Sequence, residues 1–280
     1  MSATRSLFGR AGRVGMALLL LPLMSAAAQE QRVLFPTPLH ITRELSNPIA
    51  ETKTTVDEYA VGNRVISVSG RRTAIADFER SELTVIDFEQ GTYSLTKFEQ
   101  IAKLHERAGG RRPAATTNSV RENPWTVQQR GGRVVASRPG ELIEAERKNE
   151  DGQAERVRVT ADQQLKVTRA AAEALLGFGY PNRRSEMNET VLSALQAKPQ
   201  RGAATANSAT EGDGEYHLPL EYSVAVEFDG ATVETRNVVL RVGNELPPPD
   251  VLTIPPGAKL VESDLVATWR LLDELDRPPQ

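Results

Sequence analysis

The feature that most constrains the fold is a ten-residue cadence in ADFERSELTVIDFEQGTYSLTKFEQIAK, residues 76–103. Phe78, Phe88 and Phe98 recur ten residues apart, and a glutamate follows each of them. A strand of about six residues plus a turn of about four gives this period. The intervening ERSE and EQGT segments carry the serine and glycine that such turns use. Solenoid repeats run to roughly 20 residues or more. The cadence therefore predicts an antiparallel meander.

The third copy of the cadence changes from strand to helix. In KFEQIAKLHERA, Phe98, Ile101 and Ala102 have helical spacing, and the glycine pair at 109–110 is a typical helix end. The three phenylalanines hold equivalent places in consecutive elements, so we expect them to lie close together. We expect Phe88 to be the most buried of the three and Phe98 to seat the helix on the sheet.

The middle strand of the meander is apolar on both faces. In ELTVIDF, Leu83 and Val85 point one way, while Ile86 and Phe88 point the other. A solvated sheet shows clean alternation of polar and apolar residues, whereas a strand that is apolar on both sides has both faces covered. The pattern therefore predicts a covered sheet, with a helix filling its concave side.

The N-terminus has the order of a secretory signal peptide. Three arginines occur within the first 13 residues, and the apolar segment VGMALLLLPLM follows at 14–24. Small residues in SAAAQ then offer the A-x-A pattern that precedes a cleavage site. We predict export and cleavage after Ala28. An N-terminal membrane anchor is the alternative, although the apolar segment is short for a membrane span.

Composition narrows the possible functions. The chain contains no cysteine, which excludes disulfides, thiolate nucleophiles, cysteine-ligated metals and lipid attachment at an N-terminal cysteine. The formal net charge is −3, so there is no basic field to attract nucleic acid. We therefore predict a periplasmic protein that is not lipidated. We expect no nucleic-acid partner and no membrane span in the mature chain.

Three passages resemble the periplasmic lipoprotein-carrier superfamily, the LolA-like half-barrels. They are VISVSGRRTAIADF at 65–78, LTVIDFEQGTYSLTKFEQI at 83–101 and PPPDVLTIPPGAKLVE at 247–262. The first is similar to a strand pair of that group, the second to a hairpin that runs into a helix, and the third to a proline-rich final strand. The resemblance implies an α+β fold, in which a strongly curved antiparallel β-sheet (half-barrel) has helices plugging its concave face. It also implies that acyl chains bind there.

The domain organisation follows from the same signals. After the signal peptide, residues 29–52 form a proline-containing extended lead-in, and residues 53–260 form the half-barrel domain. Within that domain, residues 198–215 are rich in small and polar residues and are expected to be a mobile loop. Asp-Gly at 229–230 predicts a long hairpin. Residues 261–280 are expected to form an amphipathic helix and a tail.

A ligand cavity is expected beneath the meander. The residues expected to line it are Leu83, Val85, Tyr93, Leu95, Phe98 and Ile101. The alternative is that they are plain core, because large apolar side chains are mostly buried for stability. Arg71 and Arg72 are candidates for binding an anionic head group. Their alternative role is a solvated strand edge whose positive charge discourages aggregation.

The residues capable of catalysis or metal binding are few and scattered. The chain has three histidines, which are His40, His105 and His217, and no two of them have the spacing of a zinc site. Asp77 and Asp87, each beside a glutamate, occupy matching ends of successive strands. They could form a cation site or an acid–base pair, but aspartate at a strand end more often stabilises a turn. We predict no catalytic residue, no metal and no cofactor.

Three functions remain open from the sequence. The first is a non-enzymatic periplasmic protein that holds an acyl chain or another lipid in its curved sheet. The second is an envelope protein–protein interaction or stress-sensing module, supported by the proline-rich arms and the terminal amphipathic helix. The third is a hydrolase that uses Asp77 and Asp87.

Overall fold

The computed structural model describes the chain between Val33 and Ala267, with gaps. Contacts divide the chain into residues 1–32 and 33–280, and every described residue belongs to the second unit. The described ranges are 33–48, 51–110, 124–148, 152–177, 186–197, 214–228, 231–264 and 266–267. In these ranges, no helix has the length and apolar character needed to cross a membrane.

Several expectations lie outside the described residues. The signal peptide at 1–28 is wholly outside them. Of the loop expected at 198–215, only Gly214 and Glu215 are described, and Glu215 begins a strand. Of the C-terminal helix expected within 261–280, only a short helical start at 264 and 266–267 is described.

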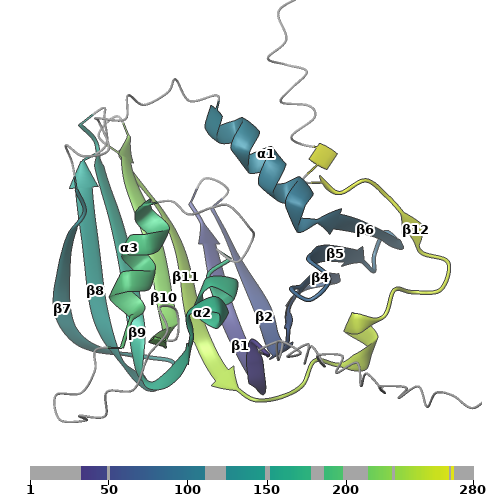
Figure 1. Cartoon of the computed structure of the whole chain (residues 1–280), viewed down its shortest axis with the longest axis horizontal. Coiled ribbons are helices and arrows are strands. Elements are labelled where there is room, and N and C mark those ends of the chain that lie inside the picture. The colour runs from purple at the N-terminus through teal and green to yellow at the C-terminus, as the bar shows by residue number, and fades with distance from the viewer. Residues whose placement is uncertain are drawn as a thin grey trace, which may run out of the picture. The chain divides into compact units, whose positions relative to one another are not determined.

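Twelve strands form one sheet, in the order β12-β6-β5-β4-β3-β2-β1-β11-β10-β9-β8-β7 (Figure 1). Neighbouring strands are antiparallel, except that β12 runs parallel to β6. The strands are β1 (Phe35–Asn47), β2 (Thr52–Gly62), β3 (Arg64–Ser69), β4 (Arg72–Asp77), β5 (Glu82–Asp87), β6 (Thr92–Lys97), β7 (Thr126–Val135), β8 (Arg138–Lys148), β9 (Ala154–Thr168), β10 (Glu215–Phe228), β11 (Ala231–Gly243) and β12 (Lys259–Leu260).

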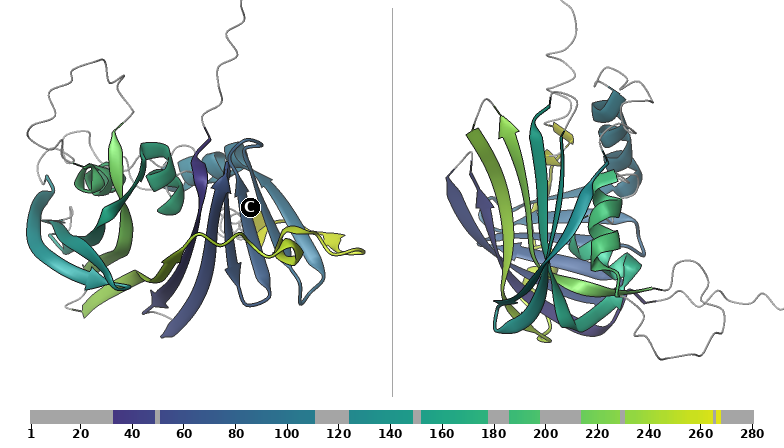
Figure 2. Two further views of the ribbon diagram at one scale, coloured as in Figure 1. Left: turned by 90° about the horizontal axis from the view of Figure 1, so that it is seen from below. Right: turned by 90° about the vertical axis from the view of Figure 1, so that its left-hand side faces the viewer.

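Three α-helices pack on one face of this sheet, which we call the helix face. Figure 2 shows them on the same side of the strands in both views. They are α1 (Phe98–Gly110), α2 (Arg169–Leu175) and α3 (Glu186–Leu195), and a short 3-10 helix, η2 (Pro249–Leu252), lies elsewhere. The side chain of Thr168 caps α2 by accepting a hydrogen bond from the backbone N–H of Ala171 at 3.2 Å.

The expected fold class is wrong. The structure is a large mixed sheet, not an α+β half-barrel whose concave face is plugged by helices. Strands account for most of the described residues, helices are few, and the described strands run from one edge at β12 to another at β7 without closing. The physical reason is the length of the strands. Several contain 11 to 15 residues, so the sheet itself buries most of the core.

Strand β1 joins two groups of strands into this single sheet. It pairs with β2 on one side and with β11 on the other, at positions such as Ile41↔Glu58 and Ile41↔Val242. The segment expected as an extended lead-in, residues 29–52, thus supplies a strand in the middle of the sheet. Ile41 is fully buried there. The hydrophobic core around Ile41 also contains side chains from α2, including Ala171 and Leu175.

The ten-residue cadence is confirmed as a meander of β4, β5 and β6 that leads into α1. Each phenylalanine follows a strand, and its backbone N–H donates to a carbonyl in an earlier turn. The three bonds are Phe78 to Asn63, Phe88 to Arg71 and Phe98 to Ser81, all at 2.9 Å. The turns need left-handed backbone at Ser81 (φ 51°) and Gly91 (φ 62°), which explains the small residues there. The hairpin expected at 229–230 is also confirmed, because Phe228 pairs with Ala231.

The expected grouping of the three phenylalanines is only partly correct. Phe78 and Phe98 lie together, with ring centroids 5.5 Å apart in an edge-to-face arrangement. Phe88 lies at the opposite end of the meander, because consecutive antiparallel strands end on alternate sides. Phe98, not Phe88, is the most buried of the three, at 4% exposure. It packs with Ala76 and Ile101 and seats α1 on the sheet.

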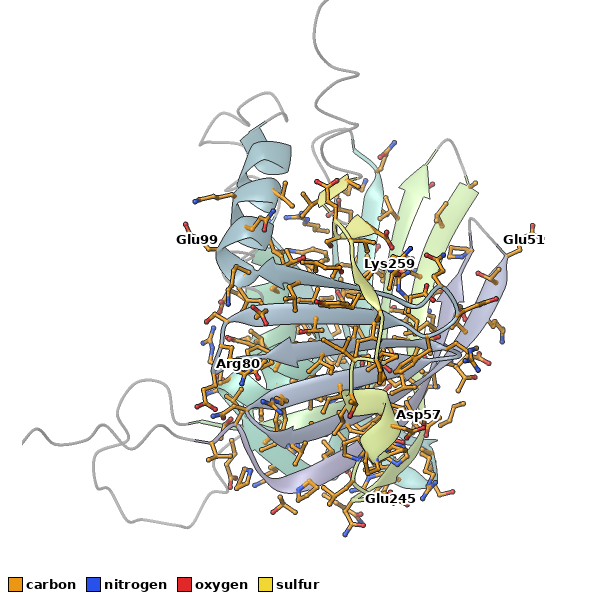
Figure 3. All side chains as sticks on the ribbon, turned by 90° about the vertical axis from the view of Figure 1, so that its right-hand side faces the viewer. Glu51, Asp57, Arg80, Glu99, Glu245 and Lys259 are labelled. Carbon is orange, nitrogen blue, oxygen red and sulfur yellow. The ribbon has the colours of Figure 1, made fainter. Side chains whose placement is uncertain are left out.

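The other face of the meander is crossed by a C-terminal segment, residues 244–262, which we call the strap. Figure 3 shows the strap running across the strands. Its η2 helix contacts β4, and its end pairs with β6 as β12. Ile66, Thr73 and Ile86 point to this strap face and are at most 1% exposed. Leu95 on the same face is 44% exposed, so the strap covers only part of this face, and the predicted cover of both faces is only partly present.

Replacing Phe98 with alanine is expected to cost about 3–5 kcal/mol of unfolding free energy, because the change leaves a cavity beneath α1. Phe88→Ala is the matched control, and its partly exposed ring should cost at least about 1 kcal/mol less. Urea unfolding of both variants measures the difference. A larger loss for Phe88→Ala would contradict the assignment of Phe98 to the core.

Candidate functional site

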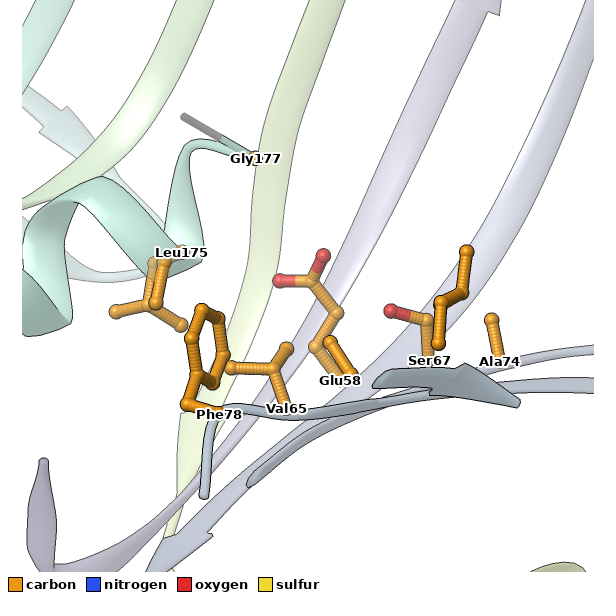
Figure 4. A pocket seen from close by; sticks show the side chains of 10 residues that line it. Glu58, Val65, Ser67, Ala74, Phe78, Leu175 and Gly177 are labelled. Carbon is orange, nitrogen blue, oxygen red and sulfur yellow. The ribbon is translucent and has the colours of Figure 1, made fainter. Parts of the chain in front are cut away.

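A pocket of about 180 Å³ lies on the helix face, between the strands β2–β5 and the end of α2 (Figure 4). Eight of the ten described residues that line it are apolar or glycine, and the other two are a glutamate and a serine, but polar atoms make up about half of the lining surface. The lining residues are Glu58, Val65, Ser67, Ala74, Ala76, Phe78, Leu83, Ala174, Leu175 and Gly177. Small-molecule sites usually combine apolar side chains with a few polar groups.

The floor of the pocket consists of small side chains. Ser67 pairs with Ala74 across β3 and β4, and Ala76 lies two residues further along β4 on the same face. Larger side chains surround this floor, with Phe78 and Leu83 on the side of α1. Small residues on a sheet face leave depth that neighbouring large residues do not fill, so the pocket follows from the sequence of β3 and β4.

One end of the pocket is charged. Glu58 on β2 is 17% exposed at its side chain, and its Oε2 accepts a hydrogen bond of 2.5 Å from Nε of Arg43. Arg43 lies on β1 and is 1% exposed. Its Nη1 lies 3.5 Å from the Asn237 side-chain oxygen, and its Nη2 has no hydrogen-bond partner in the described structure. Breaking such a buried ion pair by removing one partner is strongly destabilising.

The structure places the six predicted lining residues in three different environments. Leu83 lines the pocket. Phe98 and Ile101 lie beside it as part of the α1 core. Val85 shares the helix face with Leu83 but is not among the lining residues. Tyr93 and Leu95 point to the strap face, as their pairing with Ile86 and Thr84 shows, and Leu95 is 44% exposed.

The predicted arginines are not part of the pocket. Arg71 lies exposed in the β3–β4 turn, and Arg72 forms an ion pair with Asp264 after the strap. The charged group of the pocket is Glu58, which sequence reasoning missed. The signal that could have revealed it is the alternation of Val56, Glu58 and Ala60 in β2, which puts an acidic residue on the buried face of the strand.

Asp77 and Asp87 stabilise turns at opposite ends of the β4–β5 pair. Asp77 accepts hydrogen bonds from the backbone N–H of Arg80 at 2.9 Å and from Nε of Arg64 at 2.8 Å. Asp87 accepts from the backbone N–H groups of Glu89 at 3.0 Å and Gln90 at 2.8 Å. Asp77 lies opposite Glu82 at one end of the β4–β5 pair, and Asp87 lies opposite Arg72 at the other end. The two carboxylates therefore do not form a shared cation site or an acid–base pair.

The environment of Asp77 shifts its acidity. Burial raises the pKa of the Asp77 carboxyl, but the hydrogen bonds from Arg80 and Arg64 and the charges of those two residues outweigh burial, so the pKa is lowered. A carboxyl with a lowered pKa in the folded protein stabilises the fold at every pH above its unfolded pKa of about 3.9. That contribution is lost as the pH falls through the lower, folded value.

Asp77→Asn is therefore expected to lower the unfolding free energy at pH 7, and the difference from wild type should narrow as the pH falls below about 4. Urea unfolding at a series of pH values measures it. Asp250→Asn, which changes an exposed carboxylate in η2, is the control for net charge and should stay within about 0.5 kcal/mol of wild type. A pH-independent deficit in Asp77→Asn would contradict the role of its charge.

A second polar cluster lies on the strap face around His40, which is 7% exposed. Its Nε2 lies 3.0 Å from Asp57 Oδ1, and its Nδ1 lies 3.1 Å from Glu245 Oε2. The His40 ring stacks on Tyr59 with centroids 4.2 Å apart. Figure 3 labels Asp57 and Glu245 near the start of the strap. Because Glu245 belongs to the strap, the cluster joins the strap to β1 and β2.

The described histidines and acidic residues do not suggest a metal centre. His217 is partly buried on β10, and its Nδ1 has no partner in the described structure. The side chain of His105 lies outside the described residues. In the described part of the chain, no group of three or more such side chains has the arrangement to hold a metal ion.

Comparisons with known proteins add no relative. No protein-family model matches the sequence, and no curated protein matches it. A solved structure of PNGF-II matches with a TM-score of 0.35 and 8% identity, over 84% of this chain and 32% of that chain. This chain thus spans about a third of the length of PNGF-II. A likeness this weak supports no conclusion about fold or function, so the site is interpreted from its own geometry.

Proposed function

We propose that this protein is a non-enzymatic binding protein that holds an apolar ligand, such as part of an acyl chain, in the pocket on its helix face. The observation that carries the proposal is the floor of small side chains, Ser67, Ala74 and Ala76, beside the larger apolar side chains of Phe78, Leu83 and Leu175. A sheet face that only needed to be packed would be filled by larger side chains, because protein interiors are close-packed.

The size of the pocket limits what it holds. Its volume is about 180 Å³. Sites for drug-sized molecules are larger, at about 300–1,000 Å³. The pocket therefore suits the end of an aliphatic chain, with the remainder of a longer lipid outside it.

The chemistry of the lining also supports binding without catalysis. Of the described side chains that line the pocket, Glu58 is the titratable one, and Arg43 Nε donates a hydrogen bond to one of its oxygens. Nucleophilic catalysis by a serine needs a base within hydrogen-bond reach, and among the described residues no hydrogen bond joins Ser67 to Glu58, its opposite partner on β2. A binding role needs only the apolar walls and one polar end.

The proposed location is the periplasm, on the strength of the signal-peptide pattern in residues 1–28. N-terminal sequencing of the protein from the cell envelope tests the location. A mature chain that begins at Gln29 is expected, and one that begins at Met1 would contradict export with cleavage.

Filling the pocket should abolish ligand binding. Ala74→Leu adds a branched side chain to the floor and is expected to remove the co-purifying ligand without lowering thermal stability, because it fills existing space. Native mass spectrometry of protein purified gently from the cell envelope measures the bound ligand in wild type and variant.

The matched control is Ala231→Leu, the same substitution at an exposed position at the start of β11. It should retain the ligand at the wild-type level. A ligand that survives Ala74→Leu would place the binding site elsewhere. A ligand-free mass for wild type under all gentle conditions would count against the proposed function.

The strap supports a second candidate, an envelope protein–protein interaction or stress-sensing module. The strap carries several exposed large apolar side chains, which are Leu246, Leu252, Ile254, Leu260 and Val261 at 38–63% exposure, and exposed apolar residues gathered on one segment favour a docking surface. Crosslinking in envelope extract tests it, with the double variant Leu246→Ser/Leu260→Ser as comparison. This candidate requires one stoichiometric partner that the double variant loses. A partner retained by that variant, or no partner, would remove it.

A further inference from the structure

We propose that the pocket selects an aliphatic ligand that ends in a hydroxyl group over one that ends in a carboxylate, with Glu58 and Ser67 as the residues that determine this preference. The inference rests on the proposed function and names the chemical class of the ligand. It departs from the anionic head group that Arg71 and Arg72 suggested in the sequence.

The first argument is the direction of the Glu58–Arg43 pair. Glu58 lines the pocket, whereas Arg43 does not. Figure 4 shows the Glu58 carboxylate pointing away from the strands into the pocket. The ion pair thus presents its acceptor end to a ligand and keeps its cation in the sheet core, where Arg43 is 1% exposed.

The second argument is the free hydrogen-bonding capacity of Glu58. Its Oε2 accepts from Arg43 Nε at 2.5 Å. Among the described residues, no group donates a hydrogen bond to Oε1. A carboxylate accepts hydrogen bonds and donates none. A ligand that satisfies Oε1 must therefore supply a donor.

The third argument is the place of Ser67. It is the directly opposite partner of Glu58 across β2 and β3, and side chains in such positions lie about 5 Å apart at Cβ. A serine hydroxyl can donate a hydrogen bond while a ligand hydroxyl donates to Glu58. An alcohol, which both donates and accepts, thus matches the two lining groups. A ligand carboxylate would lack the donor and would bring a like charge to Glu58, which is unfavourable.

Arg43 acts as a positioning residue. Its guanidinium holds Glu58 through Nε and reaches Asn237 on β11 through Nη1. The acceptor in the pocket is therefore oriented by β1, the strand that joins the two groups of strands.

The experiment compares two ligands of equal chain length on the wild-type protein, 1-hexanol and hexanoate at pH 7.5, by ligand-observed NMR titration. We expect 1-hexanol to bind at least about tenfold more tightly than hexanoate, because one hydrogen bond to a charged group accounts for a difference of this size. Ser67→Ala should weaken the binding of 1-hexanol severalfold. The control is Ser69→Ala, which changes a serine on the same strand and face that does not line the pocket.

Glu58→Gln alone leaves Arg43 buried without its partner, so folding of that variant is not assumed. The double variant Arg43→Met/Glu58→Leu replaces the pair by apolar side chains and should lose the preference for 1-hexanol. Equal or tighter binding of hexanoate by wild type would overturn this inference and leave the proposed function standing. Failure of both probes to bind would overturn the proposed function, and the inference with it.

Discussion

The structure depends on one strand that is paired on both sides. Strand β1 lies between β2 and β11, so the strands β2–β6 and the strands β7–β11 are joined into one continuous hydrogen-bonded sheet. Its buried side chains, including Ile41 and Arg43, reach the cores of both groups. If β1 were absent, β2 and β11 would become open edges, and exposed edges favour aggregation.

The meander of β4–β6 carries a different cover on each face. Helices pack on one face, whereas the strap crosses the other and ends as β12 against β6. On the strap side Ile86 is fully buried, whereas Leu95 is 44% exposed. The helix side leaves the pocket, because α2 ends at Leu175 while the floor below it consists of alanine and serine. The pocket thus forms where small side chains leave space between the strands β2–β5 and the helix α2, whose positions are fixed by their other contacts.

Local signals in the sequence predicted local structure well. The cadence located three strands and the start of α1 at Phe98, because a turn and its flanking residues determine such features over a few positions. The predictions were wrong where they depended on how the strands are arranged relative to one another in space. Phe88 lies away from the other two phenylalanines because antiparallel strands alternate their ends. Tyr93 and Leu95 lie on the strap face because the register of β5 with β6 puts them beside Ile86 and Thr84.

The sequence by itself determined the turns, the period of the meander and the apolar character of both its faces, since each has its cause within about ten residues. Only the tertiary structure decided which strands flank β1, which residues meet around the pocket and that the sheet dominates the fold. The pair of Arg43 with Glu58 spans 15 positions, and the contact of Arg43 with Asn237 spans 194. Contacts at such separations are selected by the packing of whole strands against each other, and no short stretch of sequence contains that information.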